Sequence, residues 1–75
     1  MTTHFKMIFT TCKDEAEART LARALVEKKL AACVNILPNM GSIYMWEGEV
    51  AEATEAKLLI KTKADKMNDV FLTIK

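Results

Sequence analysis

Residues 33–61 hold two long apolar, β-branched segments that constrain the fold more than any other part of the chain. The first, Cys33 to Trp46, would span on the order of 40 Å if extended at ~3.3 Å per residue, whereas a compact domain of 75 residues has a diameter of roughly 30 Å. Pro38 predicts a bend or bulge within it. Glu47–Gly48 predicts a tight turn into the second segment, Glu49 to Lys61. We therefore expect a hairpin longer than its own domain, with an apolar overhang best covered by another subunit.

The flanking segments predict one further strand and two helices. Phe5 to Cys12 reads as a strand in which Met7, Ile8 and Phe9 are expected to be buried on both faces. Apolar residues at helical spacing predict a helix from Asp14 to Lys29, capped by Asp14 or a neighbour, and a second helix that starts within 62–65.

This order of elements favours an α+β ferredoxin-like sandwich of the type βαββα, with one antiparallel sheet and two helices on one face. We expect the final strand of such a sandwich to be missing, which leaves one sheet edge open.

Composition limits the functions that are open to the chain. A length of 75 residues allows one small domain, and 51% of them are hydrophobic, which favours oligomerisation. The net charge of +1 without a basic stripe argues against nucleic acid as a partner, and the apolar run near the N-terminus is too short for a signal peptide or a membrane span.

Two cysteines fit neither a disulfide framework nor a four-ligand zinc site, so we expect a cytoplasmic protein. With one histidine and two glycines, no catalytic constellation is present, so we expect a non-enzymatic protein that requires no cofactor.

Several segments in combination resemble the divalent-cation tolerance family CutA. They are LVEKKLAACVNILP, SIYMWEGEV, LLIKT and the opening Thr11-Cys12-Lys13-Asp14-Glu15. The resemblance implies a ferredoxin-like fold, a homotrimer whose long hairpins build the interfaces, and a role in tolerance of copper and other divalent ions. Family members normally continue into a segment with a His-Pro-Tyr-like motif and a further strand. By this resemblance, residues 1–75 form a single CutA-like domain that is incomplete at its C-terminus.

The two cysteines are the candidate metal ligands, with Cys33 the better one because it matches a cysteine position frequent in the family. A thiolate suits Cu(I), and the alternative is that Cys33 is a small buried core residue. Its neighbours Ala31, Ala32 and Val34 predict a buried thiol with a raised pKa, which would need a second soft ligand from Cys12, a methionine or another subunit. Cys12 precedes a helix N-terminus, which favours a thiolate, and the alternative is a packed thiol.

Three other residues are candidates for an intersubunit cleft or interface. Tyr44 and Trp46 alternate along a strand and are expected on one sheet face, as interface packing or as the wall of a cleft. Lys61 ends an apolar strand, where it can snorkel or reach an anion. His4 is expected to be solvated, with adventitious metal binding as the alternative.

Two functions follow from this reading. The first is a non-enzymatic cytosolic protein of copper and divalent-cation tolerance that binds metal weakly as a homotrimer. The alternative is a trimeric interaction or signalling module, architecturally similar to the PII proteins, that binds a small anion or a partner segment in an intersubunit cleft.

Overall fold

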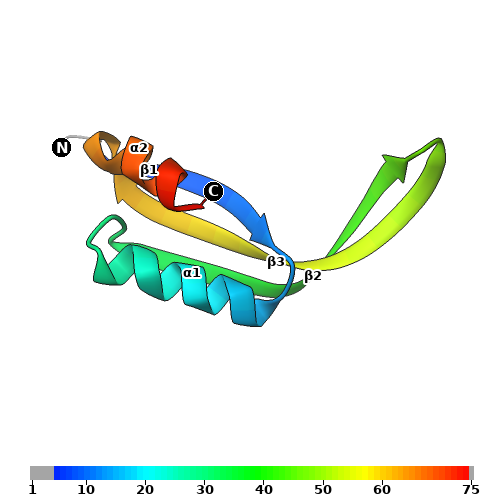
Figure 1. Ribbon diagram of the computed structural model, residues 1–75, viewed down its shortest axis with the longest axis horizontal. Coiled ribbons are helices and arrows are strands. Elements are labelled where there is room, and N and C mark those ends of the chain that lie inside the picture. The colour runs from blue at the N-terminus through cyan, green and yellow to red at the C-terminus, as the bar shows by residue number, and fades with distance from the viewer. Residues whose placement is uncertain (1–4, 75) are drawn as a thin grey trace.

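The computed structural model describes residues 5–74 as a three-stranded antiparallel sheet with two helices (Figure 1). The elements in chain order are β1 (Phe5–Cys12), α1 (Glu15–Glu27), β2 (Cys33–Trp46), β3 (Glu49–Lys63), the single 3-10 turn η1 (Ala64–Lys66) and α2 (Met67–Ile74). The strand order is β1-β3-β2, and β3 runs antiparallel to both neighbours. The predicted βαββα order and α+β ferredoxin-like arrangement are confirmed. His4 lies outside the described residues.

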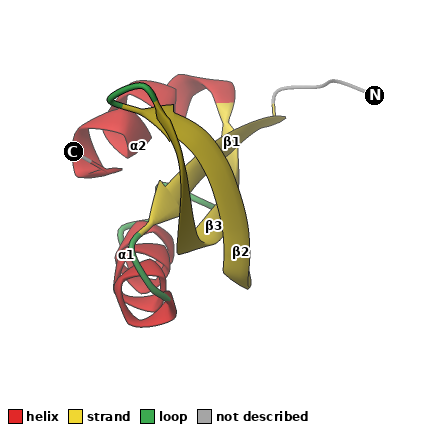
Figure 2. Cartoon of the chain, turned by 90° about the vertical axis from the view of Figure 1, so that its right-hand side faces the viewer, coloured by secondary structure: helices red, strands yellow, loops and turns green. Residues whose placement is uncertain are grey.

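Both helices lie on the same side of the sheet, as predicted (Figure 2). The centre of the core consists of Leu58 and Ile60 from β3, Leu25 from α1 and Val70 from α2, all of which are fully buried. Leu58 and Ile60 are two residues apart on a strand, so their side chains point to the same face. Burial of these apolar side chains is the main favourable term that holds the helices against the sheet.

The prediction that β1 is buried on both faces is wrong. Ile8 points into the core, but the side chains of Met7 and Phe9 are 45% and 59% exposed. Neighbouring residues of a strand point to opposite faces, and no described element of this chain covers the face that carries Met7 and Phe9.

The hairpin formed by β2 and β3 extends well beyond the helices (Figure 1). The molecule measures 45 × 24 × 22 Å and its radius of gyration is 14.0 Å, compared with ~11 Å expected for a compact chain of this length. The turn at its tip has positive φ angles at Glu47 (49°) and Gly48 (81°), which is the combination that a two-residue type I′ hairpin turn requires. The predicted overlong hairpin and its tight turn are confirmed.

Pro38 produces a bulge and does not end the strand. Leu37 pairs with Lys57 and Met40 pairs with Glu55, so Pro38 and Asn39 together lie opposite Ala56 alone. Asn39 adopts a φ of 56°, which asparagine tolerates better than most residues. The extra residue keeps β2 continuous and bends the hairpin.

The connection between α1 and β2 determines where β2 begins. Asp14 caps α1 by accepting a hydrogen bond from the Glu17 amide at 2.8 Å. The helix ends before the predicted Lys29, because Lys29 turns to a φ of 60° and the Leu30 amide donates back to the Leu25 carbonyl at 2.9 Å. The buried Thr62 hydroxyl then donates to the Leu30 carbonyl. These bonds position β2 so that Cys33 pairs with Lys61.

Within residues 5–74, neither helix has the length and apolar character needed to cross a bilayer.

We predict that Thr62→Val lowers the free energy of unfolding by about 1–3 kcal/mol, because it preserves the shape of the side chain but leaves the Leu30 carbonyl without its donor. The control is Thr54→Val on an exposed part of the same strand, with an expected change within about 0.5 kcal/mol. Urea denaturation followed by circular dichroism measures both. Equal midpoints for the two variants would show that the Thr62 hydrogen bond contributes nothing to stability.

Candidate functional site

The sheet face opposite the helices is the most extensive candidate site of the chain. We call it the open face. Strand alternation and the register of the three strands define its members. They are Phe5, Met7, Phe9 and Thr11 on β1, Cys33, Asn35 and Leu37 on β2, and Lys57, Leu59, Lys61 and Lys63 on β3.

The open face combines exposed apolar side chains with a row of lysines. Lys57, Lys61 and Lys63 lie along the central strand, with Phe9 and Leu37 among the exposed apolar residues beside them. The Lys57 ammonium lies 4.8 Å from the centre of the Phe9 ring, which is within the range of a cation–π contact. A surface of this kind can bind a partner through its apolar area and an anion through its lysines.

Cys33 belongs to the open face, and the prediction that its thiol is buried is wrong. The side chain is exposed, whereas the next residue, Val34, points toward the core. Val34 is the next residue of β2 and points to the opposite face, while Ala31 and Ala32 precede the strand, so these sequence neighbours leave the Cys33 thiol exposed.

The described residues of one chain do not form a metal centre. Cys33 pairs with Lys61, and Lys61 pairs with Met7 on its other side, so the two soft ligands Cys33 and Met7 flank an ammonium group. Their Cα atoms lie two strand spacings apart, about 10 Å, and the intervening positive charge opposes a cation. Among residues 5–74 there is also no cluster of three or more His, Cys, Asp or Glu side chains suited to a metal ion.

Cys12 cannot act as the second ligand for Cys33. It pairs with Ala56, whereas Cys33 pairs with Lys61, an offset of five residues or about 17 Å along β3. Cys12 is also buried on the helix side of the sheet. The structure therefore separates the two predicted metal ligands and gives the buried position to Cys12.

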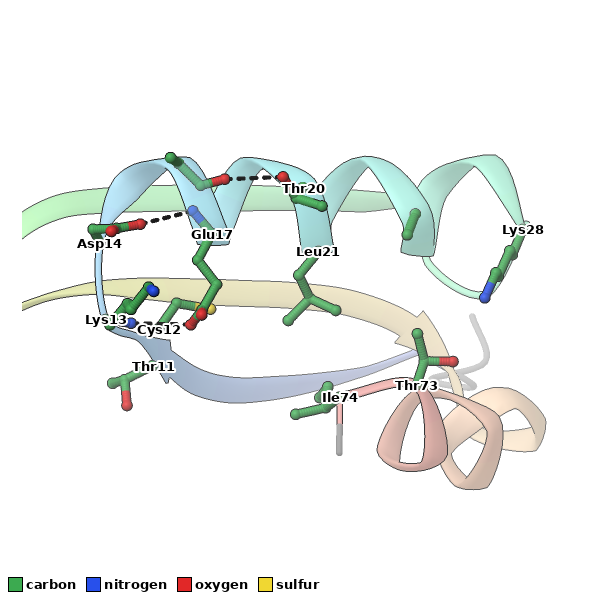
Figure 3. A pocket seen from close by; sticks show the side chains of 12 residues that line it. Thr11, Cys12, Lys13, Asp14, Glu17, Thr20, Leu21, Lys28, Thr73 and Ile74 are labelled. Carbon is green, nitrogen blue, oxygen red and sulfur yellow. Dashed lines mark hydrogen bonds between the residues drawn. The ribbon is translucent and has the colours of Figure 1, made fainter.

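Cys12 lines a groove of about 730 Å³ between the end of β1, one side of α1 along its length to Lys28, and the end of α2 (Figure 3). Burial raises the pKa of the Cys12 thiol, and the nearby carboxylates of Glu17 and Asp14 raise it further. Glu17 is held in place because its side chain also accepts a hydrogen bond from the Lys13 amide at 3.1 Å. A neutral, shielded thiol is a poor nucleophile and a poor metal ligand, in contrast to the thiolate that a helix N-terminus alone would favour.

Tyr44 and Trp46 lie on the continuation of the open face along the hairpin. Tyr44 pairs with Ala51 and Trp46 with Glu49, and the odd-numbered residues of β3 all point to the side that carries Lys61. The bulge at Pro38 and Asn39 shifts the alternation of β2 by one residue, so that Cys33 and Leu37 before it share a face with Tyr44 and Trp46 after it. The predicted interface residues Tyr44, Trp46 and Lys61 therefore belong to one continuous surface.

The sequence reasoning missed most of the open face. Lys57, Leu59 and Lys63 alternate with the buried residues of the segment EAKLLIKTK, and this alternation was the available signal. The contact of Glu17 with Cys12 carried no comparable signal, since it depends on how α1 packs over the end of β1.

Comparison with known proteins shows which family this chain resembles in sequence and in structure. Residues 6–75 match the family described as CutA1 divalent ion tolerance protein. The chain is 54% identical to the divalent-cation tolerance protein CutA of Thermus thermophilus, over 76% of this chain and 55% of that protein. The solved Cut A1 structure from the same organism has a TM-score of 0.87 at 45% identity and covers 95% of this chain and 69% of that one. The structure of the "periplasmic divalent cation tolerance protein CutA" from Archaeoglobus fulgidus has a TM-score of 0.87 at 41% identity, with the same coverage.

The chain spans only part of the curated relatives that it matches. It covers 40% of the CutA homologue of Xenopus laevis and 55% of the Thermus thermophilus protein.

We predict that Glu17→Gln lowers the pKa of Cys12 toward its ordinary value. Glutamine removes the negative charge while its oxygen can still accept the Lys13 hydrogen bond. Because the folded-state pKa is raised, less thiolate is present at a given pH, and removing the charge should increase the alkylation rate of Cys12. The assay follows iodoacetamide modification against pH by mass spectrometry in a Cys33→Ala background. Glu27→Gln, at the far end of α1, is the matched control, and identical pH profiles for the two variants would contradict the prediction.

Proposed function

This chain belongs to the CutA1 family of divalent ion tolerance proteins, and from that membership we propose that it acts in divalent-cation tolerance as a homotrimer. The observation that carries the trimer is the open face and its continuation along the hairpin. Trp46 is 64% exposed and Phe9 is 59% exposed, and both belong to the same continuous surface. A small domain that leaves such large side chains in water gains stability when copies of itself cover them.

The proposed contact with metal is weak and forms between subunits. Cys33 has an exposed thiol, and within residues 5–74 the soft side chain across the sheet from it, Met7, lies on the far side of Lys61. A second soft ligand must therefore come from another copy of the chain, and copper or another divalent ion would be the cargo of the assembly. We propose no catalytic step and no required cofactor, and this rests on the description of the matching family, which names divalent ion tolerance and no reaction.

A second function is favoured by the lysine row. Lys57, Lys61 and Lys63 place three positive charges on one strand, and an assembly that brings copies of this strand together would concentrate them. This supports the alternative of a PII-like trimeric module that binds a small anion or an acidic partner segment in an intersubunit cleft.

We propose a cytoplasmic location because both cysteines are free and lie on opposite faces of the sheet, as expected for a protein of a reducing compartment. The relative from Archaeoglobus fulgidus is described as periplasmic. Cell fractionation with antibody detection tests the location, and recovery in an extracytoplasmic fraction would refute it.

We predict that sedimentation equilibrium at micromolar concentration gives the mass of three chains. Trp46 is the only tryptophan, and its emission should shift to shorter wavelength as the concentration rises through the assembly range, because a buried indole leaves water. Trp46→Ala removes a large interface side chain and should raise the trimer dissociation constant at least about tenfold. A wild-type chain that remains monomeric would refute the proposal.

Metal binding is tested by calorimetry with Cu(I), Cu(II) and Zn(II) on reduced, metal-free protein. We expect weak Cu(I) binding that Cys33→Ala and Cys33→Ser both lower at least about tenfold, whereas Cys12→Ala leaves it unchanged. No binding tighter than millimolar would overturn the metal proposal and favour the module that binds an anion, which a titration with inorganic phosphate then tests.

A further inference from the structure

We draw no further inference here: the strongest candidate, the groove between the end of β1, one side of α1 and the end of α2, carries nothing, because the Glu17, Thr20 and Thr73 side chains that line it already make hydrogen bonds within the chain and nothing in the structure shows what covers it.

Discussion

The fold depends on β3, because both other strands pair with it and its two faces serve different purposes. Leu58 and Ile60 project to one side and are covered by α1 and α2, while Lys57, Leu59 and Lys61 project to the other. The period of two along a strand separates these sets without any further device. A shift of one residue in the pairing would bury the lysines and expose the core, so the same alternation that builds the core also specifies the register.

The open face carries several of the large apolar side chains of this small chain. The core is limited to small and medium side chains such as Leu25, Leu58 and Val70, while most of the large aromatic and apolar residues are exposed. These exposed side chains contribute little burial to the fold of one chain. Within one chain, Lys61 also separates the soft side chains of Cys33 and Met7.

Local patterns predicted the elements well and the environments of single residues less well. The bounds of β1, the turn at Glu47–Gly48 and the βαββα order of elements along the chain needed only alternation, turn chemistry and helical spacing. The errors concern residues whose surroundings come from distant parts of the chain. Cys33 was expected to be buried because its sequence neighbours are small and apolar, and Phe9 because its strand is apolar throughout. Both lie on the face that neither helix covers.

The sequence by itself determined that the chain forms a βαββα unit with an overlong hairpin, because hydrophobic periodicity and turn residues act over a few positions and can be read along the chain. Only the tertiary structure decided that Cys12 and Cys33 lie on opposite faces of the sheet, and that the bulge at Pro38 unites Trp46 and Lys61 on one surface. These features depend on strand register and helix packing, which join residues far apart in the chain and leave no local pattern.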